Sequence, residues 1–144
     1  MNKQRFGFTL VEMMVVVAIL LVILSIGIPN LLRSRTTASE GMAVSGLRAI
    51  NNACQLFLNN NQAYPGGLAD LIPPNSTPPY IDTELASGRR QNYNFFYSQT
   101  DSGFIINANP INNVGNPRYF FMDQSGIVRF KEGGPASAAD PIFS

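Results

Sequence analysis

Glu12 is the only ionisable side chain in an apolar run that extends from Phe8 to Ile28. About 20 apolar residues are needed to cross the hydrocarbon core of a bilayer, so this run is long enough to span one. A carboxylate within such a span costs roughly 2.5–3.5 kcal/mol near its centre and less near the interface. Because an unpaired buried charge is unfavourable, we expect Glu12 to have a cationic partner when the segment is buried.

Residue types that support catalysis are scarce in this chain. It has a single cysteine, Cys54, and no histidine. A base–nucleophile pair therefore cannot be assembled, and the carboxylates outside the apolar run are scattered without a motif. We expect Cys54 to be a small buried hydrophobe, with a reactive thiol as the minor alternative. The sequence thus excludes an enzyme of the usual nucleophilic classes and indicates no cofactor.

The charge balance also limits the classes of partner. The formal net charge is +1, and loss of Lys3 and Arg5 with an N-terminal leader would make the chain slightly acidic. No basic groove accompanies the aromatic residues, so a nucleic-acid partner is not indicated. The aromatic clusters are interpreted as the core of a small sheet rather than as a stacking platform.

A long helix must position these residues. After the apolar run, apolar side chains recur at spacings of three and four residues, which is typical of an amphipathic helix with one covered face. The run Asn59 to Asn61 and the following Tyr64 to Gly67 predict its end. Gly27 and Pro29 interrupt the helix, and we expect a kink there, either as a simple bend or as a flexible point. The covered positions are Ala43, Leu47, Ile50, Cys54 and Phe57.

The second half of the chain predicts an antiparallel sheet. Short runs rich in Phe, Tyr, Ile and Val are separated by turns at 100–103 and 123–126, which predicts about four strands. Within the connection before them, 67–72 and 82–86 each predict one short helical turn. We expect the Gly, Ala and Ser-rich tail to be loosely ordered. The expected fold is α+β, and the expected segments are 1–7, a leader; 8–28, a transmembrane or filament-core helix; 29–61, the amphipathic half of the same helix; 62–92, a connecting loop; 93–131, the sheet; and 132–144, the tail.

The string Gly7-Phe8-Thr9-Leu10-Val11-Glu12, preceded by a short basic leader, resembles the processing site of type IV pilins and of the related pseudopilins of type II secretion. The resemblance is strong over about residues 1 to 60 and architectural beyond them. It implies a long helix packed on a small sheet, cleavage by prepilin peptidase between Gly7 and Phe8, and N-methylation of Phe8. It also implies that Glu12 neutralises the N-terminal amine of a neighbouring subunit, and Pro29 falls where the family commonly has a helix-bending proline.

The resemblance further implies partners and a location. The partners are other subunits in a helical homo- or hetero-filament, the prepilin peptidase and methyltransferase, and an inner-membrane assembly platform. Positive residues flank the apolar run on both sides, so charge alone does not orient it. The family's topology implies a single pass through the bacterial inner membrane before assembly, with the N-terminus in the cytoplasm. After assembly, a pilin is expected at the cell surface and a pseudopilin in the periplasm.

Two functions therefore stay open. The first is a pilin of an extracellular filament used for adhesion, motility or DNA uptake, and the alternative is a pseudopilin that drives protein export.

Major pseudopilins suggest a calcium site by analogy, and Asp123, Glu132 and Asp140 are the candidate acids here. Their spacing shows no EF-hand-like pattern, so we expect no metal. Many pilins close a C-terminal loop with a disulfide, and the lone Cys54 departs from that pattern.

Overall fold

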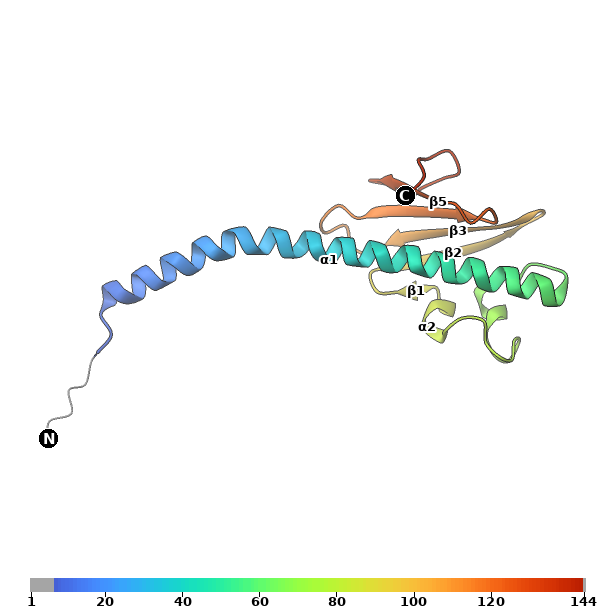
Figure 1. Ribbon diagram of the computed structural model, residues 1–144, viewed down its shortest axis with the longest axis horizontal. Coiled ribbons are helices and arrows are strands. Elements are labelled where there is room, and N and C mark those ends of the chain that lie inside the picture. Colours follow the sequence, from blue (N-terminus) through green and yellow to red (C-terminus); the bar gives the residue numbers. More distant parts are fainter. Residues whose placement is uncertain (1–6, 144) are drawn as a thin grey trace, which may run out of the picture. The chain divides into compact units, whose positions relative to one another are not determined.

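The computed structural model describes residues 7–143, so of the expected leader only Gly7 lies within it. The chain divides into two compact units, Met1–Ser34 and Arg35–Ser144, and each is described by itself. One helix, α1, Leu10–Asn61, contributes to both. The expected α+β fold, a long helix packed against an antiparallel sheet, is confirmed (Figure 1).

The first unit contains the N-terminal part of α1. Helical geometry continues through Gly27 and Pro29, which both lie inside α1. None of the described side chains in this unit is buried. Its structure is therefore that of an isolated helix, whose stability in water would be marginal without a partner surface.

The second unit contains a five-stranded antiparallel meander in the order β1-β2-β3-β4-β5. Figure 1 shows the C-terminal part of α1 lying along the sheet. We predicted about four strands, and the additional one is the two-residue β1, which is too short to carry a hydrophobic alternation. The strands are β1, Arg89–Arg90; β2, Tyr93–Thr100; β3, Gly103–Pro110; β4, Arg118–Asp123; and β5, Val128–Glu132.

The core of the second unit lies between α1 and one face of the sheet. Every residue of the predicted helical stripe belongs to it, with Phe57 only partly buried. Gly46 allows a close approach, because a Cβ there would lie 2.7 Å from Cζ of Phe95. The cross-strand register aligns one row of mostly aromatic residues on the inner face of the sheet. Because the residues of this row pack in the core, apolar side chains recur at every second position of a strand, and this alternation made the strands predictable from the sequence. The row runs Phe95, Ala108, Phe120, Phe130.

Two short helical turns lie in the connection between α1 and the sheet, as predicted. The 3₁₀ turn η1, Leu68–Leu71, follows two glycines whose N–H groups donate to Asp70 Oδ2 at 2.8 and 3.2 Å. The helix α2, Thr83–Ala86, begins after Asp82, whose Oδ1 accepts from the Leu85 N–H at 2.7 Å. Leu68, Leu71 and Leu85 are buried, so this connection packs on the core.

The expected loose order of the C-terminal tail is wrong. Ile142 forms an antiparallel bridge with Arg129 of β5, and the Phe143 N–H donates to the Val128 carbonyl at 2.8 Å. The Phe130 N–H in turn donates to the Pro141 carbonyl at 3.0 Å. The ring of Phe143 packs edge-on against Phe130 with a centroid separation of 5.8 Å. A few long-range contacts thus order a segment whose composition is that of a flexible tail.

Candidate functional site

Thr9 caps the N-terminus of α1. Its Oγ1 accepts a hydrogen bond from the Glu12 N–H at 3.2 Å, and its carbonyl accepts from Met13 at 3.2 Å. A threonine three residues before a glutamate is the sequence signal for such a cap, although the cap was not among the predicted features. The cap fixes Glu12 in the first turn of the helix. There its negative charge is favoured by the positive end of the helix dipole.

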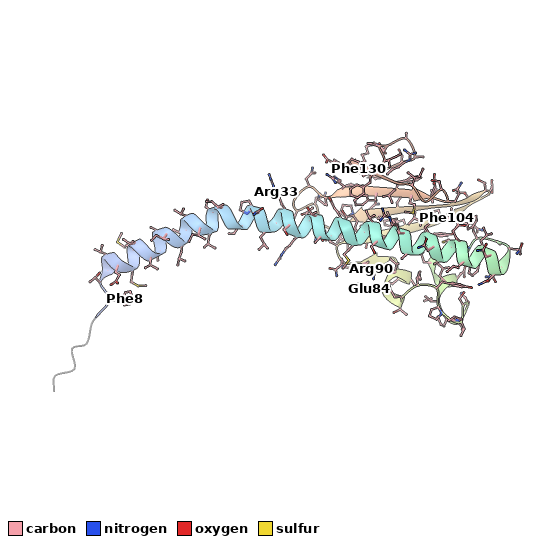
Figure 2. The ribbon with its side chains drawn as sticks, in the orientation of Figure 1. Phe8, Arg33, Glu84, Arg90, Phe104 and Phe130 are labelled. Atoms are coloured by element: carbon pink, nitrogen blue, oxygen red, sulfur yellow. The ribbon has the colours of Figure 1, made fainter. Side chains whose placement is uncertain are left out.

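The carboxylate of Glu12 is available for an external partner. Glu12 is exposed, and none of the ion pairs found among residues 7–143 includes it. Phe8 lies at the same end of the helix and is 73% exposed (Figure 2). The structure therefore places the aromatic residue and the carboxylate of the predicted processing segment together at the start of α1.

Beyond Glu12, α1 presents apolar side chains to solvent over many turns. Figure 2 shows side chains that project from this part of the helix with no other element of the unit beside them. Continuous apolar surface of this extent is rare on monomeric soluble proteins and marks a surface that a membrane or a protein covers. By length and composition α1 can cross a membrane, and it is the one such helix among the described residues. The exposed apolar residues include Leu10, Met14, Val15, Ile19, Leu20, Ile23, Leu24 and Ile26.

Cys54 is a core residue, as predicted. It is fully buried, and burial raises the pKa of its thiol to about 12, an effect that a hydrogen bond with Tyr97 only partly offsets. The thiolate, which is the reactive form, is therefore disfavoured at neutral pH.

The acids considered for calcium are engaged separately. Asp123 accepts from the Ser125 N–H at 2.9 Å, and Glu132 lies 3.6 Å from the guanidinium of Arg118. Asp140 accepts from the Ser137 N–H and hydroxyl, and these hydrogen bonds lower the pKa of its carboxyl. Among residues 7–143 no three His, Cys, Asp or Glu side chains are grouped as metal ligands.

The N-terminal segment carries a defined motif. Residues 2–28 match the model of the prokaryotic N-terminal methylation motif, which covers the predicted leader, the capped helix start and the apolar run. This match identifies the class of segment to which Phe8 and Glu12 belong.

Two kinds of protein are similar to the chain. It is 40% identical to the type II secretion system core protein G of Escherichia coli strain K12 over 81 residues, which cover 54% of this chain and 55% of that protein. The Vibrio cholerae core protein G is also 40% identical over 81 residues, with the same coverage. The type IV major pilin PilA of Myxococcus xanthus is 33% identical over 63 residues, or 44% of this chain and 29% of the pilin.

These comparisons confirm the resemblance to type IV pilins and type II secretion pseudopilins. The chain spans about half the length of the core protein G relatives that it matches. No solved structure is significantly similar to it.

Proposed function

We propose that the chain is a structural subunit of a type IV pilus-like extracellular filament rather than an enzyme. The observation that carries the proposal is an exposed apolar helix within a matched methylation motif. Its first turn holds Glu12, whose carboxylate is in no ion pair among residues 7–143. In the bilayer the apolar surface contacts lipid, and in a filament the same surface contacts other subunits. Adhesion, motility and DNA uptake are the activities of such a filament.

Maturation supplies a cationic partner for Glu12, which is in no ion pair among residues 7–143. Prepilin peptidase cleaves between Gly7 and Phe8, and N-methylation of Phe8 leaves a cationic amine at the new N-terminus. That amine lies beside the positive end of the helix dipole, which disfavours it. A Glu12 carboxylate from a neighbouring subunit pairs with it, so that neither charge is buried alone and the axial stagger between subunits is set.

The subunit waits in the membrane before it assembles. It crosses the bacterial inner membrane once with its N-terminus in the cytoplasm, and an inner-membrane platform then moves it into the helical filament. Gly27 and Pro29 give α1 a point at which it bends during this transfer, because proline removes one helical hydrogen bond.

A pseudopilin of a type II secretion system is the alternative function. The observation that favours it is the similarity to core protein G from several bacteria, which exceeds the similarity to the pilin PilA in both identity and coverage. In that case the filament stays in the periplasm and drives protein export. The helix, its cap and the role of Glu12 are the same in both functions.

Replacement of Glu12 tests the assembly proposal. Glu12→Ala is expected to insert in the membrane at the wild-type level but to yield few filaments in electron microscopy of sheared cells or purified assemblies. Glu84→Ala is the matched control, since Glu84 is an exposed carboxylate that lies in α2 and not in α1. Wild-type filament yield from Glu12→Ala would contradict the charge-pairing proposal. Mass spectrometry that finds any N-terminus other than methylated Phe8 would contradict the maturation step.

A deletion strain separates the two functions. Loss of surface filaments with normal secretion indicates a pilin, whereas loss of exported enzymes from the medium with surface filaments retained indicates a pseudopilin.

A further inference from the structure

The Gly7–Phe8 peptide bond lies just outside the helix. Gly7 and Phe8 form neither helix nor strand, and α1 starts at Leu10. Figure 2 shows Phe8 at this end of the helix. Among residues 7–143, neither the Gly7 nor the Phe8 carbonyl accepts a backbone hydrogen bond. The bond that the proposed maturation cleaves is therefore free of helical hydrogen bonding.

The hydroxyl of Thr9 sets this boundary, because it competes with the backbone for one donor. In an α-helix each N–H donates to the carbonyl four residues before it, so a helix extended by one residue would need the Glu12 N–H at the Phe8 carbonyl. Here Thr9 Oγ1 accepts that N–H at 3.2 Å. The Thr9 carbonyl accepts the next N–H, from Met13, also at 3.2 Å. The side chain thus occupies the donor that would extend the helix toward Gly7.

Cleavage between Gly7 and Phe8 needs a backbone that is not helical. Extended peptides are bound through their main-chain hydrogen-bonding groups, which a helix uses internally. If α1 began at Phe8, the Gly7 carbonyl would accept the Val11 N–H. Hydrolysis adds one water to that carbonyl and breaks the bond, which leaves a carboxylate on Gly7 and an amine on Phe8. The carbonyl that water attacks would therefore be engaged in the first turn of such a helix.

The rest of the segment does not by itself prevent this longer helix. Glycine is tolerated as an N-cap, so Gly7 could replace Thr9 in that role. We propose that Thr9 is a positioning residue for the cleavage: its cap ends α1 at Leu10 and presents the Gly7–Phe8 bond to the peptidase in a non-helical form. The match to the methylation motif, residues 2–28, includes this cap. The proposal rests on the cleavage stated under the proposed function, and it adds the group that exposes the bond.

Replacement of Thr9 in the full chain tests the proposal. The chain in detergent micelles is incubated with purified prepilin peptidase, and mass spectrometry of the released 1–7 peptide gives kcat and KM. Thr9→Ala loses the cap and gains the best helix former, so the longer helix hides the bond for part of the time. Because helix ends exchange within about a microsecond, KM rises by the inverse of the exposed fraction while kcat stays unchanged. We expect a rise of up to about 30-fold, which corresponds to the ~0.5–2 kcal/mol of an N-cap. An unchanged KM overturns the proposal.

Three further variants separate the cap from direct recognition of the side chain. Thr9→Ser and Thr9→Asn keep an N-cap acceptor and should retain the natural KM. Thr9→Val has nearly the shape of threonine but no acceptor, and it should raise KM as Thr9→Ala does. A natural KM for Thr9→Val would mean that the peptidase reads the shape of the side chain, which overturns the proposal. A raised KM for Thr9→Asn but not for Thr9→Ser also overturns it, because the peptidase then binds the hydroxyl itself.

The start of the helix is measured directly by nuclear magnetic resonance. The carbon chemical shifts of Phe8 should move toward helical values in Thr9→Ala and stay unchanged in Thr9→Ser, and a raised KM without this movement overturns the cap as its cause. Thermal unfolding of the second unit should be unchanged in every variant, since Thr9 lies outside that unit. A natural chain that is not cleaved between Gly7 and Phe8 would overturn the maturation step itself, whereas equal KM values for all variants overturn only the role of Thr9.

Discussion

Glu40 of α1 binds Arg118 of β4 through two contacts. The backbone N–H of Arg118 donates to Glu40 Oε1 at 3.0 Å, and the guanidinium of Arg118 lies 3.7 Å from Glu40 Oε2. The Glu40 side chain is only 11% exposed, whereas that of Arg118 is 37% exposed. The same guanidinium stacks 5.1 Å from the Phe130 ring centroid and 5.8 Å from that of Phe143. One carboxylate on the helix thereby orders a cation that also contacts β5 and the tail.

Removal of the Glu40 carboxylate is expected to destabilise the second unit. Glu40→Ala leaves the Arg118 N–H without its acceptor and should lower the free energy of unfolding by about 1–3 kcal/mol. Glu40→Gln keeps a carbonyl oxygen as acceptor and should recover part of the loss. Chemical denaturation of the full chain in detergent, followed by circular dichroism, measures both. Glu132→Ala is the control, because Glu132, the other partner of Arg118, is 58% exposed and a surface ion pair contributes about 0–1 kcal/mol. An equal loss of stability in Glu40→Ala and Glu132→Ala would contradict the role of Glu40.

Two glycines of α1 are expected to respond to alanine with opposite signs. At Gly46 the new Cβ would lie 2.7 Å from Phe95 Cζ, and Phe95 is only 4% exposed, so Gly46→Ala should destabilise by about 1–3 kcal/mol. At Gly41 nothing lies within 4 Å, so Gly41→Ala should stabilise by up to about 1 kcal/mol through helix propensity. Thermal unfolding of the two variants side by side checks the prediction. A stabilised Gly46→Ala would show that helix and sheet are not in close contact at this point.

The tail is expected to protect β5. Phe143→Ala removes a partly buried ring that packs on Phe120 and Phe130, and it should lower stability by about 1–3 kcal/mol, less than the ~3–5 kcal/mol of a fully buried Phe. Because the Phe130 N–H donates to Pro141, its amide hydrogen should also exchange faster. Ile142→Ala, at a 55% exposed position of the same segment, should change neither quantity much. Unaltered exchange at Phe130 in Phe143→Ala would mean that the tail is held by other contacts.

Stability is expected to fall at alkaline pH. Burial raises the pKa of the Cys54 thiol to about 12, and burial also raises the pKa of the Tyr97 and Tyr93 hydroxyls above their ordinary range. A free thiol has a pKa of about 8.5 and a free tyrosine about 10, so these groups ionise in the unfolded chain before the folded one. Their contribution is complete below about pH 8 and is lost progressively as the pH rises toward the folded values.

The melting temperature measured from about pH 8 to about pH 11 tests this dependence. Cys54→Ala should start lower because it leaves a cavity, but its melting temperature should fall less steeply with pH than that of the natural chain. Equal slopes for the two chains would show that Cys54 does not contribute to the alkaline loss.

Local patterns were sufficient to predict the helix and the turns. The spacing of Leu47, Ile50 and Cys54 indicates one covered helix face, and all three are fully buried. Asp82 predicts the start of α2 because an N-cap needs only its own side chain and the next turn. Such features depend on neighbours a few residues away, which the sequence displays directly.

Long-range pairing explains what sequence patterns did not reveal. Glu40 precedes Ala43 on the same helix face, yet its partner Arg118 is far along the chain, so nothing nearby indicated a buried carboxylate. The tail was misjudged for the same reason, since Phe143 is ordered by β5 and Phe120 rather than by its Gly and Ser-rich surroundings.

The candidate site lies between these two cases. The Thr9 to Glu12 cap is local and could have been predicted from its spacing. Cleavage at Gly7–Phe8, methylation of Phe8 and the pairing of Glu12 involve other molecules, and they stay predictions.

The edge of the sheet at β5 is closed to strand addition. The tail covers β5 through two hydrogen bonds. At the opposite edge the two-residue β1 pairs only with Tyr93 and Asn94 of β2. Long, uncovered edge strands recruit strands from other molecules and cause aggregation, whereas short, charged or covered edge strands do not. Under the proposed function the subunit concentrates in a membrane and then stacks through its helix, and the covered edge would prevent indiscriminate strand pairing from competing with ordered growth. The aromatic contacts of Phe143 thus hold the tail over β5 and keep this edge from recruiting a strand of another molecule.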